Sequence, residues 1–306
     1  MTTKGSVIGV ISNIVTIQVD GPVSQNEICY ITVNGDRLMA EVIKVVGQNA
    51  YVQVFESTRG MKVGAEAEFT GHMLEVTLGP GMLSKKYDGL QNDLEKMEGV
   101  FLKRGQYTYP LDEDKKWAFK PLVKAGDTVA ASAWLGEVEE NHQPLKIMAP
   151  IAMKGTAVVK SIVPEGEYLC NDTIAVLTAE DGTEIPVTMV QKWAVKVAMT
   201  NYKEKPRPFK LLETGVRTID TMNPIVEGGT GFIPGPFGTG KTVLQHAISK
   251  QAEADIVIIA ACGERANEVV EVFTEFPELI DPHTGRKLME RTIIIANTSN
   301  MPVAAR

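Results

Sequence analysis

The sequence predicts a multidomain protein made of an N-terminal small β-barrel, an inserted β-rich bulge module and an incomplete α/β domain with a phosphate-binding loop. Three observations predict this fold class. Short β-branched runs fill residues 1–72, a second β-rich stretch fills about 110–200, and apolar runs alternate with helical patterns after Leu211. A chain of 306 residues has room for two or three cores. We expect domains at 1–72, 110–200 and 201–306, with 73–109 as the start of the last one.

The first 72 residues have the pattern of a small closed barrel. The pair Asn34-Gly35 between two β-branched runs is a strong signal for a hairpin turn. Because a closed barrel has no free edges, this unit suits a collar that packs side by side with copies of itself. The expected β segments are Val7–Val19, Tyr30–Val33, Leu38–Val46 and Tyr51–Phe55.

The segment 73–109 is mixed, with one expected helix near Leu90–Met97. From Pro110 to Val197 the pattern is β-rich again, and prolines bracket it at both ends. This stretch is typical of a separate β module inserted into a larger fold. Its turn and strand signals lie at 124–129, 164–168, 174–178 and 193–198.

An alternating α/β pattern follows Leu211. The second of its expected strands is apolar enough to be buried on both faces. The expected strands are Thr230–Pro234, Ile256–Cys262 and Arg291–Thr298, and the expected helices follow the glycine-rich loop and span Asn267–Phe276. A doubly wound sheet that stops at Arg306, just after a helix start at Pro302, is unfinished, so we expect this sequence to be a fragment.

Residues 235–242 read Gly-Pro-Phe-Gly-Thr-Gly-Lys-Thr, a complete match to the pattern G-x-x-x-x-G-K-[S/T]. The glycines let successive backbone N–H groups point at phosphate oxygens. Lys241 adds a positive charge for the β- and γ-phosphates, and the Thr242 hydroxyl can ligate Mg²⁺. The pattern predicts binding of a nucleoside triphosphate. The expected binding residues are Gly235, Pro236, Phe237, Gly238, Thr239, Gly240, Lys241, Thr242 and Val243.

The composition argues against several other function classes. A net charge of −7 disfavours nucleic acid as the main partner, because a phosphate backbone requires a basic face. The three cysteines are isolated, which indicates a reducing cytoplasm, and the four histidines lack metal-ligand spacing. The longest apolar run is far shorter than a membrane span, and the N-terminus lacks a signal-peptide core. We expect any membrane to be reached through partner subunits.

Six motifs occur in one order along the chain, and together they closely resemble the catalytic A subunit of V/A-type rotary ATPases. The likeness runs from the first barrel to the last residue, and the insertion at 110–200 is similar to that subunit's bulge domain. The motifs are Asp88-Gly89-Leu90-Gln91, Gly215-Val216-Arg217-Thr218-Ile219-Asp220, Gly235–Val243, Gly263-Glu264-Arg265, Phe276-Pro277-Glu278-Leu279 and Asn297-Thr298-Ser299-Asn300-Met301-Pro302.

The resemblance implies a RecA-like domain that uses ATP or ADP with Mg²⁺, coupled to H⁺ or Na⁺ movement through a separate membrane sector. Three such subunits would alternate with three non-catalytic B subunits, held by central-stalk and peripheral-stalk subunits on the cytoplasmic face of a membrane. The family's Walker B aspartate, adenine-pocket aromatics and C-terminal helices would follow Arg306. We therefore expect the isolated chain to have negligible ATPase activity.

Two catalytic residues are expected. Glu264 follows the strand Ile256–Cys262 at the sheet edge that carries the loop, where a carboxylate can polarise the attacking water. Lys241 neutralises phosphate charge, and an arginine finger would come from the B subunit. Arg265 could contact a phosphate or make an interface salt bridge. Two alternatives remain: a non-enzymatic nucleotide-binding or assembly module, and a related hexameric secretion or transcription-termination ATPase, which the insertion and the acidic balance disfavour.

Overall fold

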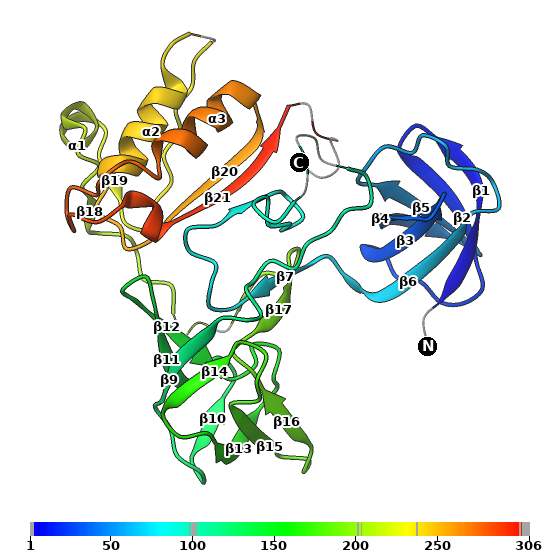
Figure 1. Cartoon of the computed structure of the whole chain (residues 1–306), viewed down its shortest axis with the longest axis horizontal. Coiled ribbons are helices and arrows are strands. Elements are labelled where there is room, and N and C mark those ends of the chain that lie inside the picture. The colour runs from blue at the N-terminus through cyan, green and yellow to red at the C-terminus, as the bar shows by residue number, and fades with distance from the viewer. Residues whose placement is uncertain are drawn as a thin grey trace.

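The computed structural model describes residues 3–97, 99, 103–200, 202, 204–236, 238–299 and 301. It contains three bodies: an N-terminal β-barrel, a β-sandwich and a C-terminal α/β unit (Figure 1). A central segment that includes β7 (Glu75–Leu78) and β17 (Gln191–Ala194) lies between them. The predicted combination of barrel, inserted β module and incomplete α/β domain is confirmed.

Six antiparallel strands close the barrel in the order β1-β2-β5-β4-β3-β6. Alternate side chains fill the interior, among them Ile17, Leu38 and Phe69, which are almost completely buried. The predicted hairpin forms, with Asn34 and Gly35 at φ of 53° and 95° and Val33 paired with Asp36. The strands are β1 (Lys4–Ile11), β2 (Ile14–Val19), β3 (Glu27–Val33), β4 (Asp36–Val46), β5 (Asn49–Val54) and β6 (Glu66–Met73).

Two features of the barrel differ from the sequence prediction. The run Val7–Val19 is two strands, because Ser12 adopts a φ of 56° and turns the chain so that Val10 pairs with Val15. β6 was not predicted, although it closes the barrel by pairing with both β1 and β3. Its alternating Glu66–Phe69 pattern is short, and its partners are distant in sequence.

The inserted module is a sandwich of two four-stranded sheets, ordered β10-β13-β15-β16 and β12-β11-β9-β14. One apolar core contains Leu135 and Leu177, and a second contains Phe119 and Ile174. The strands are β9 (Lys116–Pro121), β10 (Thr128–Ala130), β11 (Trp134–Glu140), β12 (Gln143–Met148), β13 (Thr156–Ile162), β14 (Gly166–Leu169), β15 (Ala175–Ala179) and β16 (Glu184–Val187). β7 and β17 pair antiparallel, so the two connections of the module lie side by side, as an inserted unit requires.

The α/β unit is built on a parallel sheet of three strands in the order β20-β21-β8. β21 is central and mostly buried, with Ile294 inaccessible to solvent, and Phe276, the residue directly after helix α3, packs in the same core. No helix in the described part of the chain is both long and apolar enough to cross a membrane. The elements are β8 (Lys86–Tyr87), β18 (Leu211–Leu212), α1 (Arg217–Met222), β19 (Ile225–Val226), α2 (Lys241–Gln251), β20 (Val257–Glu264), α3 (Ala266–Glu275), the 3₁₀ turn η1 (Leu288–Arg291) and β21 (Thr292–Thr298).

Three predictions for this region are wrong. Thr230–Pro234 is not a strand, and Phe232 is 87% exposed; its glycines weaken a strand and Pro234 cannot donate to a ladder. β20 is not buried on both faces, because it lies at the edge of the described sheet and Ile258 is 62% exposed. Leu90–Met97 is not a helix: Gln91 adopts a φ of 63°, and the Asp88 carboxylate accepts the Leu90 and Asn92 N–H groups in a turn.

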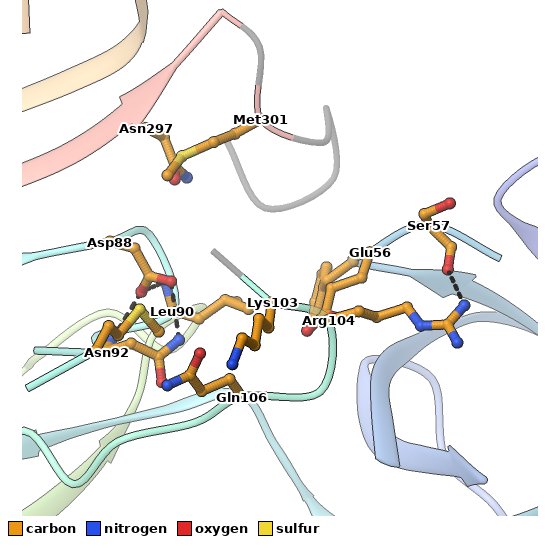
Figure 2. Close-up of a pocket in the computed structure, with 12 residues that line it drawn as sticks. Glu56, Ser57, Asp88, Leu90, Asn92, Lys103, Arg104, Gln106, Asn297 and Met301 are labelled. Carbon is orange, nitrogen blue, oxygen red and sulfur yellow. Dashed lines mark hydrogen bonds between the residues drawn. The ribbon is translucent and has the colours of Figure 1, made fainter. Parts of the chain in front are cut away.

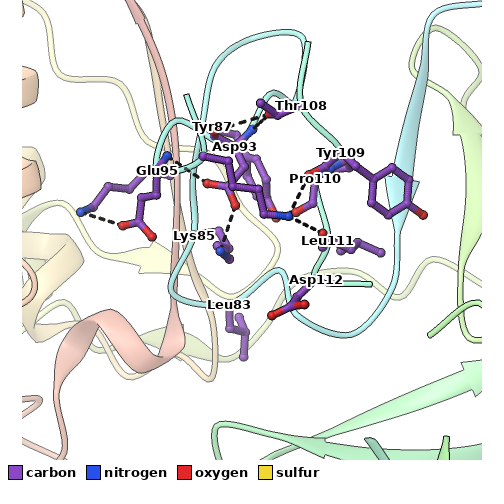
Figure 3. A network of polar contacts seen from close by, with 12 residues as sticks. Leu83, Lys85, Tyr87, Asp93, Glu95, Thr108, Tyr109, Pro110, Leu111 and Asp112 are labelled. Carbon is purple, nitrogen blue, oxygen red and sulfur yellow. Dashed lines mark hydrogen bonds and ion pairs between the residues drawn. The ribbon is translucent and has the colours of Figure 1, made fainter. Parts of the chain in front are cut away.

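A polar network fixes this turn segment between the sheet and the sandwich (Figure 3). Asp93 is fully buried; its Oδ2 lies 2.9 Å from Lys85 Nζ and its N–H donates to Thr108 Oγ1 at 2.7 Å. The Tyr87 hydroxyl donates to the Pro110 carbonyl at 2.9 Å. Tertiary polar contacts, rather than helix formation, therefore satisfy the backbone here.

Asp93→Ala should lower the free energy of unfolding by about 3 kcal/mol, because Lys85 would keep a partly buried ammonium without its carboxylate. Glu95→Ala is the control: Glu95 also pairs with a partly buried lysine, Lys86, but its own side chain is 48% exposed, so its removal should cost less than about 1 kcal/mol. Urea denaturation of both variants measures the difference. Equal losses would contradict the structural role of Asp93.

Candidate functional site

The glycine-rich loop precedes α2 directly and leaves the first turn of that helix open. Gly240 is the N-cap residue at a φ of 79°, and Gly238 adopts 81°, both in the left-handed region that favours glycine. No side chain caps the helix, so no capping group separates its positive dipole end from an anion. A Cβ on Gly235 would come within 2.5 Å of Thr239 Oγ1, so only glycine lets the loop close there.

The loop borders a cavity of about 330 Å³. Of the predicted binding residues, Gly238 through Val243 line it; Gly235 and Pro236 lie at the start of the loop, and Phe237 lies outside the described residues. The opposite wall comes from the end of β20 and the first turn of α3. The lining residues are Gly238, Thr239, Gly240, Lys241, Thr242, Val243, Glu264, Arg265 and Glu268.

Glu264 reaches this cavity because β20 ends in a bulge. The pairing of β20 with β21 shifts register between Cys262 and Glu264, with Gly263 at a φ of 82° between them. Glu264 then pairs with Thr298, and its carbonyl accepts the Ser299 N–H at 2.8 Å. The structure thus places both predicted catalytic residues, Lys241 and Glu264, around one cavity at the carboxyl edge of the sheet.

Glu268 is a site residue that sequence reasoning missed. Its Oε2 accepts a hydrogen bond from the Thr242 hydroxyl at 3.0 Å, and its Oε1 lies 3.8 Å from Arg265 Nη1. A sequence signal existed: Glu268 is acidic and lies in the first turn of a helix that starts at the loop-bearing edge of the sheet. Arg265, whose role was left open, contacts this carboxylate in the structure.

The side chains of Glu264 and Glu268 interact directly. A hydrogen bond shared with Glu268, together with partial burial, raises the pKa of Glu264. The same hydrogen bond lowers the pKa of Glu268, which also accepts from Thr242. The pair therefore holds one proton more readily than two isolated glutamates would, with the proton on Glu264.

Glu268→Gln should lower the pKa of Glu264, because a glutamine amide would donate to its carboxylate and no second negative charge would face it. Carbon-13 NMR titration of the glutamate side chains should show one carboxyl titrating above its ordinary range in the native chain. That signal should move to lower pH in the variant. An unmoved signal would show that burial alone, and not Glu268, perturbs Glu264.

The oxygen donors around Thr242 suit a hard cation. Mg²⁺ prefers hydroxyl, carboxylate, water and phosphate oxygens, and the Thr242 hydroxyl and the Glu264 and Glu268 carboxylates supply such atoms. The described residues contain no group of three or more His, Cys, Asp or Glu arranged to hold a metal by themselves. The oxygen atoms of Thr242, Glu264 and Glu268 fit the ligand preference of Mg²⁺.

A second cavity, of about 230 Å³, lies between the barrel and the carboxyl edge of the sheet (Figure 2). Asp88 and Asn297 line it on the sheet side and Glu56 on the barrel side. Many of its polar groups are already paired within the chain: Arg104 donates to the Ser57 carbonyl, and Asp88 accepts from Asn92 Nδ2 at 2.8 Å. This second cavity shares no residue with the loop cavity. We assign it to the contact between the barrel and the α/β unit.

Comparison with known proteins agrees with this geometry. "ATP synthase alpha/beta family, nucleotide-binding domain" matches residues 215–306, "ATPsynthase alpha/beta subunit barrel-sandwich domain" matches 108–196, and "ATP synthase alpha/beta family, beta-barrel domain" matches 7–71. The V-type ATP synthase alpha chain of Treponema denticola is 54% identical over 307 residues, which cover 99% of this chain and 52% of the relative. That of Borrelia garinii subsp. bavariensis is 52% identical over 309 residues, covering 100% of this chain and 54% of the relative.

The three matched regions correspond in order to the barrel, the sandwich and the α/β unit. The chain therefore belongs to the ATP synthase alpha/beta family and, within it, to the V-type ATP synthase alpha chains. It spans about half the length of the curated relatives it matches.

Proposed function

We propose that this chain binds ATP or ADP with Mg²⁺ and forms part of the catalytic site of a V-type ATPase or ATP synthase. One observation carries the proposal: the open N-terminus of α2, Lys241 and the carboxylates of Glu264 and Glu268 all line one cavity of about 330 Å³. Anion binding at a helix N-terminus and acidic groups that can order water are the parts that phosphoryl transfer requires.

Each part has a proposed role. The loop amides and Lys241 would bind the phosphates, and the Thr242 hydroxyl, which donates to Glu268 in the structure, would help to hold a Mg²⁺ that neutralises phosphate charge. Glu264 would hold the water that attacks the γ-phosphorus, and Glu268 would orient Glu264 through the hydrogen bond between the two side chains. Positioning and charge neutralisation, rather than covalent catalysis, would then supply the rate.

We also propose how this chain assembles into a complete enzyme. By analogy with the V-type alpha chains, three copies would alternate with three B subunits, which donate an arginine finger, and stalk subunits would connect them to a membrane sector that moves H⁺ or Na⁺. A trans-supplied arginine is worth roughly 10³–10⁵ in rate in related phosphoryl-transfer enzymes. We therefore propose that this chain alone binds nucleotide weakly and has negligible ATPase activity. The barrel and the bulge module would serve assembly with those partners at the cytoplasmic face.

Lys241→Ala should weaken binding of Mg²⁺·ATP to this chain by roughly tenfold to a hundredfold, because it removes a charge-assisted contact to phosphate. Fluorescence titration with a labelled ATP analogue measures the affinity. Lys250→Ala is the matched control: it lies on the same helix, but its ammonium pairs with Glu275 at 2.8 Å and does not line the cavity. Equal affinity of the Lys241 variant and the native chain would refute the proposed binding site.

Glu264→Gln, in the complete enzyme assembled with its partner subunits, should lower the rate of ATP hydrolysis by about 10²–10⁴ while ATP affinity stays nearly unchanged. The physical reason is that glutamine keeps the size and hydrogen bonding of the side chain but cannot accept a proton from water. Steady-state kinetics and nucleotide titration separate the two effects. Parallel losses of rate and affinity would instead assign Glu264 to binding.

A further inference from the structure

The tip of the β11–β12 hairpin belongs to the sandwich by sequence but lies against the α/β unit. We define the hairpin tip as Glu140, Asn141 and His142. Figure 1 shows this hairpin at the end of the sandwich that faces the α/β unit. Its contacts fall at the amino edge of the sheet, opposite the edge that carries the phosphate loop.

Asn141 connects the segments that lead into two neighbouring strands. Its Nδ2 donates to the Glu290 carbonyl in η1 and to Ser84 Oγ, both at 2.9 Å. Ser84 Oγ in turn donates to the Met289 carbonyl at 3.2 Å, and the Ser84 N–H donates to the Thr292 carbonyl at 2.9 Å. One side chain of the inserted module thus joins the chain just before β8 to the chain just before β21.

Glu140 makes a second, buried contact. It is only 4% exposed, and its Oε1 accepts the Leu83 N–H at 2.7 Å. The Gly81 N–H also donates to this carboxylate, while burial raises its pKa. Leu83 packs with Tyr87 of β8 and Ile293 of β21. The hydrogen bond from Leu83 to Glu140 therefore holds a residue of the apolar cluster between these two strands. Figure 3 shows Leu83 near the ion pair of Lys85 with Asp93.

Backbone strain is concentrated at this contact. Asn141 and His142 adopt φ of 48° and 66°, and Ser84, which faces Asn141, adopts 67°. A two-residue turn with positive φ at both positions favours Asn-Gly, and a histidine at the second position costs free energy. Such strained residues persist where the surrounding structure over-determines them, and they cluster at switch and ligand sites. At the hairpin tip, this surrounding structure is the α/β unit.

We propose that the hairpin tip couples the bulge module to the nucleotide-binding sheet, so that the two unfold as one cooperative unit and a displacement of the module is transmitted to β21. Asn141 and Glu140 are the positioning residues of this link. β21 then carries the displacement to Thr298, which pairs with Glu264 at the opposite edge of the sheet. The link depends only on contacts within this chain, so it does not require nucleotide.

Hydrogen exchange of the full 306-residue chain at increasing urea concentrations tests this link. In the native chain, amides of β21 and of the β11–β12 hairpin should lose protection at one common urea concentration. The Asn141→Gly variant suits the positive φ but removes the hydrogen-bond donor. In this variant the amides of β21 and those of the β11–β12 hairpin should lose protection at different urea concentrations. Protection of β21 should fall by about tenfold to a hundredfold, as expected for two lost hydrogen bonds.

Two further variants complete the experiment. Glu140→Gln keeps an acceptor oxygen and removes the charge, so it should cause a smaller separation in the same direction without depending on a variant that fails to fold. Glu139→Gln is the matched control, because Glu139 lies on the same hairpin with an exposed side chain whose Oε1 lies 3.2 Å from His142 Nδ1. Separate transitions in the native chain, or an Asn141→Gly effect confined to the hairpin, would overturn the proposal.

Discussion

The central position of β21 is the constraint on which the rest of the α/β unit depends. β21 pairs in parallel with β20 on one side and β8 on the other, and its side chains are mostly buried. Parallel pairing brings the carboxyl ends of the strands to one edge and their amino ends to the other. Glu264 meets the phosphate loop at the first edge, and the hairpin tip docks at the second.

The candidate site needs very few residues because backbone geometry does much of its positioning. Left-handed glycines open the helix N-terminus, and the bulge at Gly263 directs Glu264 toward it. The Thr242–Glu268 hydrogen bond then occupies the hydroxyl that would ligate Mg²⁺. In the structure Thr242 and Glu268 therefore satisfy one another, and nucleotide binding would exchange this contact for bonds to phosphate and metal.

The barrel and the sandwich are stabilised independently of that site. Each has its own buried apolar cluster, and the adjacent strands β7 and β17 connect the sandwich to the remainder. Independent cores allow such modules to serve as contact surfaces. The hairpin tip is an exception to this separation, because Asn141 and Glu140 bond directly to segments of the nucleotide-binding sheet.

Much of the fold and part of the site could be predicted from the sequence. The turn at Asn34-Gly35 and helix α3 before Pro277 follow from local backbone preferences. The loop at 235–242 was also recognisable from adjacent residues, because phosphate binding requires particular residue types at fixed positions. The presence of Glu264 near the loop followed from the shared edge of parallel strands.

The sequence by itself determined these local features and the family. Only the tertiary structure decided which distant residues meet: β8 as third strand in place of Thr230–Pro234, Glu268 on Thr242, and Asn141 on Glu290. A strand of two residues has no periodicity to detect, and a polar side chain in a loop or first helical turn is by default solvated. Their partners are fixed by packing between elements far apart in the chain, which no local preference encodes.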